Sequence, residues 1–426
     1  MVNPRFRFEH SHLTIERRSF HPCIVLHHPL VKGSVLACML TGAGGVSADT
    51  DKTLQLVARY EQLHDSNLFR LSSTLPASTL GGRPWSDTIR IGSAGLLLDK
   101  SYSLQRIELN ASLVNYKYQN YDYLNFTALN YAAAWHWSIT PRLRGTLQAT
   151  QRQNSNSFSD TQDVTQRNVR TDSVLRAQGE YDMGAAVKLF GSVDQFRLRN
   201  EELLAQDRGF KVQSVAGGVR YVLPSGSQLS YRLRKGHGEY SEEATVTTTP
   251  LPTTFNNTEH ELTARWVATG KTTLYARVAH VSRQYPGFAG SDFSGPVGGL
   301  RLSWQPTAKL RLDATADRDW RSYQTQYSSY ASGNRFTLTP SWQATAHTSL
   351  RMHLEQYDED YGGAIDRANF PFDRADTTRS ASLGLDWRPR DSITLGFWLK
   401  TEKRVSNYSG FDFKNNSANF SAQISY

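Results

Sequence analysis

The chain has almost no cysteine. Its 426 residues include two, Cys23 and Cys38, and both precede a predicted cleavage site at Ala48. The mature chain would therefore have neither a disulfide framework nor a thiolate metal site. Methionine is also scarce, with four residues, whereas 20 Tyr, 19 Phe and 9 Trp are present. This balance favours β-strands over helices.

The chain also lacks long hydrophobic runs. No stretch after the amino-terminal segment approaches the roughly 18 consecutive apolar residues of a membrane-spanning helix, and the mean hydropathy is −0.53. Helical membrane spans are therefore excluded. A strand of a membrane barrel needs only about 9 to 11 residues of alternating polarity, which leaves the mean hydropathy low. The composition is thus compatible with a membrane protein that crosses the bilayer with strands.

Signatures of common catalytic and cofactor sites are absent as well. The sequence has no phosphate-binding glycine loop, no HExxH zinc pair and no GxSxG nucleophile elbow. The acidic run 357–360 lacks the ligand spacing of an EF-hand. The pI is near 9.4, but the charge is dispersed through the chain, so nucleic acid is not a predicted partner. We expect no catalytic residue, no cofactor and no metal.

An export signal is predicted near the amino terminus. Lys32 precedes a short apolar segment over residues 33–45, and Val46-Ser47-Ala48 has the small-x-small pattern of a cleavage site. We expect cleavage after Ala48, so that residues 1–48 are an extension plus signal peptide and residues 49–426 form a single barrel. Residues 1–31 are long for the charged part of such a signal, and a misassigned start would explain them.

From residue 49 onward the chain repeats one pattern: an alternating strand, a short turn, a second alternating strand and a longer polar segment. Leu300–Trp304, for example, turns into Leu310–Ala314. Trp266 begins a series of tryptophans, each just before a short turn, that follow at spacings of 38, 38 and 45 residues. Aromatic residues at one end of successive hairpins form a ring at the bilayer interface. An aromatic girdle is therefore predicted from Trp137, Trp266, Trp304, Trp342 and Trp387.

The hairpins predict a closed barrel. Eight hairpins plus a first and a last strand give about eighteen strands, with sixteen as the alternative. The last strand alternates up to Tyr426, with Phe420 and Ile424 on its apolar face, and is expected to pair with a first strand over Thr53–Glu61. A soluble propeller is disfavoured, because its blades have four strands and similar connections on both faces.

The lengths of the connections between strands predict in which membrane the barrel lies. Short turns on one side and long loops on the other are typical of outer-membrane barrels, in which the periplasmic turns are short and the extracellular loops long. The fold class is therefore all-β: a transmembrane antiparallel up-and-down β-barrel in the Gram-negative outer membrane. Long connections are predicted around 63–85, 116–124, 153–169, 199–208, 239–257, 281–297, 321–333, 357–377 and 405–415.

Along each strand, charged residues alternate with the apolar residues that form its apolar face. If that face meets lipid, the charged residues point inward, and basic ones outnumber acidic ones among those that the alternation marks. Two interpretations are open: the arginines line a path for an anionic solute, or they pair with carboxylates on neighbouring strands and brace the wall. The predicted lumen-lining residues are Arg144, Arg176, Arg220, Arg232, Arg234, Arg265, Arg277, Arg301, Arg311 and Arg351.

Tyrosines concentrate where strands are expected to leave the membrane, most densely over residues 116–123. They could stack on sugar rings or form the outer aromatic girdle, and the girdle is the favoured interpretation. Further tyrosines at similar exits support it: Tyr240, Tyr285, Tyr323, Tyr327, Tyr357, Tyr361 and Tyr408.

Several segments in the first third of the chain carry a resemblance to a known family. They are Tyr60, Asp65-Ser-Asn-Leu-Phe-Arg70, Ser86-Asp-Thr-Ile-Arg90, Lys100-Ser-Tyr-Ser-Leu-Gln-Arg106 and Tyr121-Asp-Tyr-Leu-Asn-Phe-Thr-Ala-Leu-Asn-Tyr131 with Trp135-His136-Trp137. These segments resemble the EpsL family of outer-membrane proteins linked to exosortase and exopolysaccharide biosynthesis operons. The resemblance is strongest over about residues 55–145. It implies a porin-like barrel for secreted exopolysaccharide that works with a periplasmic export apparatus, and it offers no catalytic residues.

We therefore expect an exit path for exopolysaccharide, with inward arginines favouring an anionic polymer. The expected partners are outer-membrane lipid, the polymer and periplasmic export proteins. One alternative is a non-conducting scaffold of the export machinery. A less favoured one is a barrel enzyme that modifies polymer or lipid, since His136, His280, His347 and His353 have no partner that the sequence identifies.

Overall fold

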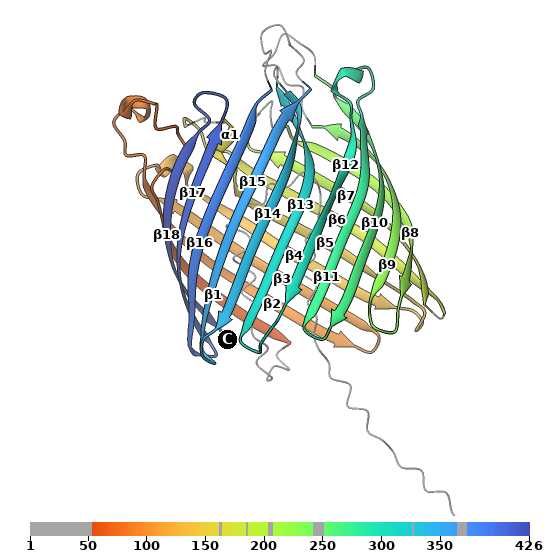
Figure 1. Cartoon of the computed structure of the whole chain (residues 1–426). Helices are drawn as coiled ribbons and strands as arrows, with labels where there is room; N and C mark the ends of the chain where they lie inside the picture. Colours follow the sequence, from red (N-terminus) through yellow and green to blue (C-terminus); the bar gives the residue numbers. More distant parts are fainter. Residues whose placement is uncertain are drawn as a thin grey trace, which may run out of the picture.

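A computed structural model describes residues 53–161, 164–184, 186–202, 208–241, 251–325, 328–363 and 373–426. These residues form one 18-stranded antiparallel sheet with very little helix (Figure 1). Among them, no helix is long and apolar enough to cross a membrane. The predicted signal segment 1–48 lies outside the described residues. The strands are β1 (Leu54–Asp65), β2 (Asp87–Tyr102), β3 (Gln105–Tyr118), β4 (Phe126–Ser138), β5 (Leu143–Ser155), β6 (Val169–Gly184), β7 (Val187–Asn200), β8 (Phe210–Val222), β9 (Gln228–Tyr240), β10 (Thr254–Thr269), β11 (Thr272–Gln284), β12 (Phe293–Trp304), β13 (Leu310–Thr325), β14 (Ser328–Gln343), β15 (Thr348–Gly362), β16 (Ala375–Arg390), β17 (Ile393–Ser406) and β18 (Phe413–Ser425).

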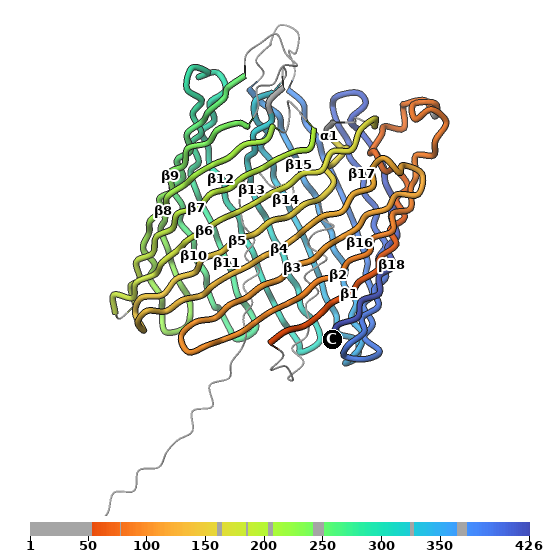
Figure 2. Tube along the Cα trace, turned by 180° about the vertical axis from the view of Figure 1, so that it is seen from behind, coloured from red at the N-terminus to blue at the C-terminus, as the bar shows by residue number. Residues whose placement is uncertain are grey.

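The sheet closes on itself into a barrel (Figure 2). Strand β1 pairs with both β2 and β18, so the first and last strands complete the ring. In the β1–β18 ladder, Val57 lies opposite Ser425 and Asp65 lies opposite Ser417. The predicted strand number, closure and pairing of the carboxy-terminal strand are confirmed, and the sheet has no free edge.

The two ends of the barrel differ. Short turns join the strands at the end where β1 begins and β18 ends. Longer connections lie at the other end, and within the described ranges four of them carry a short helical turn: η2 (Ala77–Leu80), η3 (Asp122–Leu124), α1 (Phe158–Thr161) and η5 (Ala289–Ser291). In outer-membrane barrels the short-turn end faces the periplasm.

One predicted connection is wrong. The sequence predicts a long loop around 321–333, but β13 continues to Thr325 and β14 begins at Ser328, with Thr325 paired to Ser328. The segment is rich in polar residues because this hairpin extends beyond the apolar belt, the band of apolar side chains on the outer surface that faces lipid. Polarity therefore marks the end of the belt here and not the end of the strand.

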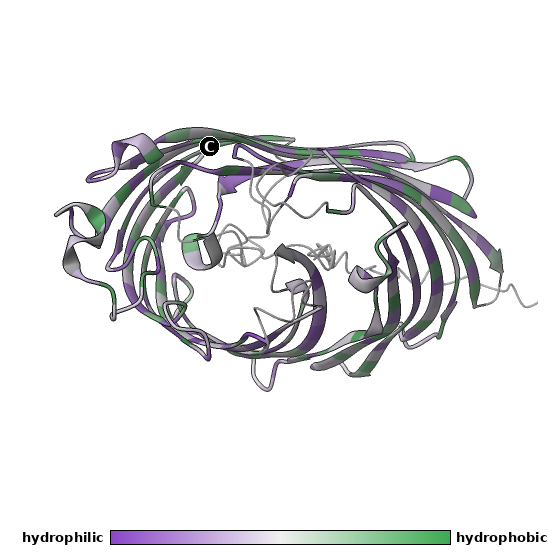
Figure 3. Ribbon diagram, turned by 90° about the horizontal axis from the view of Figure 1, so that it is seen from above, coloured by the Kyte–Doolittle hydropathy of each residue, from purple (hydrophilic) through white to green (hydrophobic). Residues whose placement is uncertain are grey.

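Alternate residues of each strand face outward. On β18, Phe420 and Ile424 are 47% and 54% exposed, whereas Ser421 on the other face is buried. Seen along its axis, the barrel is an oval ring in which polar and apolar positions alternate along the strands (Figure 3). An apolar exterior and a polar interior are what a bilayer-spanning barrel requires.

Several inward aromatic rings lie over glycines of the adjacent strand, and two of them illustrate the arrangement. Phe255 is directly opposite Gly238, and Trp398 is directly opposite Gly384. A Cβ atom added to Gly238 would fall 2.2 Å from the Phe255 ring, and one added to Gly384 would fall 2.3 Å from the Trp398 ring. Glycine is required at these positions because any side chain would displace the ring.

Candidate functional site

The ten arginines predicted to line the lumen lie on the inward phase of their strands. Glu180 lies opposite Arg144, and Lys188 lies opposite Arg220, so these charged residues share one face of the sheet. The other face of the same strands carries exposed apolar side chains such as Val193 and Val219. The inner wall is therefore the polar face, and its charges are the candidate site.

Glu180 on β6 binds basic side chains from three other strands. Arg144 Nη2 lies 2.6 Å from Glu180 Oε1, and Lys188 Nζ lies 3.3 Å from the same oxygen. Arg220 Nη1 lies 2.5 Å from Oε2. Asp182 adds a second carboxylate, 3.8 Å from Lys188 Nζ. Three cations around two carboxylates leave this part of the wall positive.

A second network joins β9, β10 and β11. Arg277 Nε lies 2.5 Å from Glu261 Oε2, and Arg277 Nη2 lies 2.7 Å from Glu259 Oε1. Arg232 Nη2 contacts the same two carboxylates at 3.0 and 3.3 Å. The side chains of Arg277 and both glutamates are at most 10% exposed. Buried charges require this mutual satisfaction, because an unpaired ion in such a place is costly.

Three more of the predicted arginines are paired. Arg234 Nη2 lies 2.5 Å from Asp194 Oδ2, and Arg176 Nη2 lies 3.8 Å from Asp194 Oδ1. Arg311 forms a two-point contact with Asp313 on its own strand, at 2.7 and 3.0 Å. Pairing across the wall, the second interpretation of the sequence, therefore describes most of the predicted arginines.

The sequence also missed inward residues of both signs. Alternation marks strands well only where one face is apolar, and most of the missed residues lie near strand ends, beyond that region. With them included, the excess of basic residues on the inner wall is smaller than the sequence suggested. The missed residues include the acids Glu61, Asp99, Asp172, Asp182, Glu259, Asp319, Glu359 and Asp376 and the bases Arg59, Arg170, Arg283, Arg321, Arg335 and Arg404.

Two of the remaining predicted arginines flank a tyrosine. Arg265 on β10 lies directly opposite Tyr275 on β11, and Tyr275 lies directly opposite Arg301 on β12. Arg265 donates to the Gly226 carbonyl oxygen at 3.0 Å. Within the described part of the chain, neither arginine forms an ion pair. All three side chains are half-buried and lie a few residues from the short turns, so two uncompensated cations stand at the periplasmic end of the wall.

Arg351, the tenth predicted arginine, lies elsewhere. Its guanidinium is 5.7 Å from the centre of the inward Trp398 ring on β17. This distance fits a cation–π contact. Arg351 thus contacts an aromatic ring, and it forms no ion pair with a carboxylate of the described residues.

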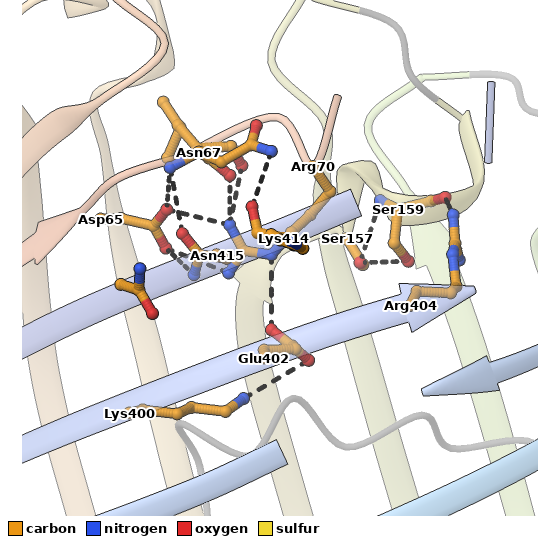
Figure 4. Close-up of polar contacts among 12 residues, drawn as sticks. Asp65, Asn67, Arg70, Ser157, Ser159, Lys400, Glu402, Arg404, Lys414 and Asn415 are labelled. Carbon is orange, nitrogen blue, oxygen red and sulfur yellow. Dashed lines mark hydrogen bonds and ion pairs between the residues drawn. The ribbon is translucent and has the colours of Figure 1, made fainter. Parts of the chain in front are cut away.

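At the opposite end, the β1–β2 connection is bound to β18 (Figure 4). Asn67 donates from its side chain to the Lys414 carbonyl oxygen at 3.0 Å and from its backbone N–H to Asn415 Oδ1 at 3.0 Å. Arg70 forms a two-point ion pair with Asp65, both contacts at 3.0 Å. Asp65–Arg70 is one of the segments that carry the family resemblance. Its polar residues fasten the first long loop to the closing strands.

The β5–β6 connection also reaches the closing strands (Figure 4). Arg404 on β17 donates a hydrogen bond to the Ser159 carbonyl oxygen in α1. Next to it, the Phe158 ring lies 4.8 Å from Phe69 of the β1–β2 connection, and Phe69 lies 4.8 Å from Tyr121. Phe69 and Tyr121 are 1% and 2% exposed. The β1–β2, β3–β4 and β5–β6 connections therefore share a small apolar core at the extracellular end of the barrel.

Most of the tyrosines assigned to the outer girdle point inward, so that interpretation is wrong for them. Tyr285, Tyr323 and Tyr361 are 1–2% exposed, and the rings of Tyr323 and Tyr361 are 4.9 Å apart. They follow the inward phase of the charged residues, which a count of alternate positions along each strand would have shown. Tyr116, Tyr118, Tyr240 and Tyr357 are inward as well, and Tyr327 lies outside the described residues.

The predicted girdle tryptophans lie on the outer face. Trp266, Trp304, Trp342 and Trp387 are 59%, 43%, 49% and 48% exposed, each close to a short turn. Trp137 is half-buried because its ring lies where a Cβ atom of the opposite Gly145 would be. This placement suits an interfacial ring, and the girdle itself stays a prediction.

One histidine has a serine partner. His280 Nε2 lies 3.0 Å from Ser294 Oγ on the outer face. His136 and His353 make similar cross-strand contacts with threonine hydroxyls, so such a contact does not by itself indicate an activated nucleophile, which also needs a group that orients the base. Among the described residues, no group of three or more His, Cys, Asp or Glu is placed to hold a metal ion.

No protein-family model and no curated protein sequence matches this chain. Solved structures do resemble it. OccK2 (OpdF) of Pseudomonas aeruginosa is 12% identical, with a TM-score of 0.50 over 88% of this chain and 97% of that one. OpdK of Pseudomonas aeruginosa, crystallised with vanillate, is 10% identical, with a TM-score of 0.50 over 88% and 99%. A BenF-like porin from Pseudomonas fluorescens is 10% identical, with a TM-score of 0.50 over 88% and 98%.

These similarities concern the fold. The fold is that of the outer-membrane porins. Together with the apolar exterior and the closed ring of eighteen strands, it makes this chain an outer-membrane β-barrel. Identities of 10–12% carry no information about the solute.

Proposed function

We propose that this barrel is a porin-like exit path for an anionic exopolysaccharide. The observation that carries the proposal is the pair of uncompensated arginines, Arg265 and Arg301, on either side of Tyr275. The porin fold and the polar inner wall support a path through the barrel. The resemblance to the EpsL family supports exopolysaccharide as the solute and periplasmic export proteins as partners.

The arrangement suits an acidic sugar. Strands lie about 4.8 Å apart, so the Cα atoms of Arg265 and Arg301 are separated by roughly 10 Å across Tyr275. Arginine forks recognise carboxylate, sulfate and phosphate groups, and an aromatic ring offers a face on which a sugar ring can stack. A polymer arriving from the periplasm would meet these side chains early, because they lie near the short turns.

Conductance and secretion test the proposal together. Purified protein in planar bilayers should form open channels, and a deletion strain should retain exopolysaccharide in the periplasm while its surface polymer falls. A strain with normal surface polymer would contradict the proposal, whether or not the protein conducts ions.

A non-conducting scaffold of the export machinery is the second candidate. The packing of three long connections at the extracellular end favours it, since Phe69, Tyr121 and Phe158 form a core there. Under this alternative, no conductance should be seen even after the β5–β6 connection is shortened, and the protein should still co-purify with periplasmic export proteins.

A further inference from the structure

Three basic side chains lie side by side on the outer face of the barrel, near its long-loop end. Arg379 on β16 lies directly opposite Lys403 on β17, and Lys403 lies directly opposite Lys414 on β18. All three are exposed. Within the described part of the chain, none of them forms an ion pair. We call these three residues the outer basic row.

The outer basic row lies on the same face of the strands as the lipid-facing side chains. Leu383 on β16, Leu399 on β17 and Phe420 on β18 are 53%, 48% and 47% exposed on the same face. Each of them lies between the row and the short-turn end of its strand. The row therefore begins where the apolar belt ends, on the side of the outer leaflet.

The row is electrostatically unfavourable without an anion. Like charges directly opposite each other on neighbouring strands repel and destabilise the sheet. Arg379 Nε has a neutral partner, Gln356 Oε1, at 3.1 Å. The nearest acid on the same face of β15, Asp358, is bound to Gln356 and Thr377, at 2.9 and 2.7 Å. The repulsion in the row is therefore left for an external anion to relieve.

We propose that the outer basic row binds the phosphate groups of a phosphorylated glycolipid in the outer leaflet. The row lies at the level of the lipid headgroups and combines one guanidinium with two ammonium groups, both good partners of phosphate. Basic residues at a membrane surface attract anionic headgroups. The secreted polymer is a poor ligand for this surface, because the row faces away from the inner wall.

The same arrangement recurs elsewhere on the barrel. Arg90 on β2 lies directly opposite Lys117 on β3, and both side chains are exposed on the outer face near the long-loop end. Like-charge contacts at two separate places on this level agree with a lipid surface that supplies anions around the barrel.

Native mass spectrometry of the full-length protein in detergent tests the site, with bisphosphorylated lipid A and its dephosphorylated form as probes. The wild type should bind the bisphosphorylated form preferentially. The triple variant R379Q/K403Q/K414Q should bind it roughly tenfold more weakly or worse. The control K100Q/K309Q/R390Q removes three exposed cations from the short-turn end and should bind like the wild type.

A second readout separates binding from misfolding. In lipid-free detergent, K403Q should raise the thermal unfolding temperature, because it removes repulsion from both neighbours. With bisphosphorylated lipid A, the wild type should gain more stability than K403Q. Undiminished binding by the triple variant, an equal loss in the control, or preference for a soluble anionic polysaccharide over lipid A would each overturn the proposal.

Discussion

Arg277 on β11 and Glu261 on β10 form a buried contact on the inner wall, with Nε 2.5 Å from Oε2. The same guanidinium also binds Glu259 at 2.7 Å. Arg277 thus contacts two buried carboxylates on the neighbouring strand, and Arg232 on β9 contacts the same two. The charged residues of the inner wall therefore join neighbouring strands to one another as well as line the lumen.

Removal of this arginine should destabilise the barrel strongly. In Arg277→Gln, the two glutamates lose their main counter-charge in a poorly solvated place, and we expect a loss of about 3–5 kcal/mol in the free energy of unfolding. Denaturant unfolding in detergent, followed by tryptophan fluorescence, measures it. Arg311→Gln is the control: that side chain is 57% exposed, and its loss should cost about 1 kcal/mol or less. Equal effects of the two substitutions would contradict the assignment.

Gly384 should not tolerate a side chain. Its added Cβ atom would lie 2.3 Å from the Trp398 ring, so Gly384→Ala must shift the ring and should cost about 1–3 kcal/mol in the free energy of unfolding. Gly217→Ala is the matched control, because nothing lies within 4 Å of its added Cβ atom. If the ring is the cause, the cost of Gly384→Ala should shrink in a Trp398→Leu background.

Closure of the barrel predicts a specific cross-link. Tyr60 and Ala422 lie directly opposite each other on β1 and β18, within the Cα separation of about 4.4–6.8 Å that a disulfide needs. In a background without Cys23 and Cys38, Tyr60→Cys with Ala422→Cys should oxidise to a disulfide that peptide mass spectrometry detects. Tyr60→Cys with Ala418→Cys, four residues out of register, should stay reduced. The reverse result would mean a different register at the seam.

One contact between the long connections should depend on pH. Arg167 Nε donates to Glu201 Oε2 at 2.9 Å, and this hydrogen bond lowers the pKa of the Glu201 carboxyl below its ordinary value. A lowered pKa means that the contact stabilises the folded loops fully above the ordinary pKa of 4.5. The stabilisation is lost as the pH falls through the lowered pKa.

Hydrogen exchange measures this loss. The Val169 N–H also donates to Glu201, at 3.2 Å, so its exchange, corrected for the intrinsic rate, should accelerate between about pH 6 and about pH 3. Glu201→Gln should show fast exchange that hardly changes over this range. A pH dependence that survives Glu201→Gln would assign the effect to another group.

Closure and strand number could be predicted because they are encoded locally. The alternation that ends at Tyr426 states which face of β18 is apolar, and a strand that cannot end at an open edge must pair with β1. The contacts that the long connections make with distant strands could not be predicted. The contact of Arg404 with Ser159 joins residues 245 positions apart, and nothing in the local pattern of either segment indicates the other.

The inner wall could be predicted only in part. Period two places Arg277 and Glu261 on the correct face but misses Glu259, so the sequence alone does not decide between pairing across the wall and attraction of a solute. The tyrosines show the same limit. Tyr361 lies where an interfacial residue is expected along the strand, yet its phase turns it inward beside Tyr323. The position of a residue along the barrel axis and the face of the strand on which it lies are independent. Both are needed to predict where its side chain points.

The uncompensated arginines should set the ion preference of the channel. Arg265→Gln with Arg301→Gln removes two cations that lack carboxylate partners, so anion preference should fall with little loss of stability. Arg232→Gln leaves Glu259 and Glu261 less compensated and should lower stability as well. Reversal potentials in a salt gradient measure the preference, and oligogalacturonate added on the short-turn side should block the wild type more strongly than the double variant. Because two uncompensated charges act together, the half-blocking concentration should rise roughly tenfold or more. An unchanged reversal potential and unchanged block in a conducting double variant would remove these arginines from the transport path.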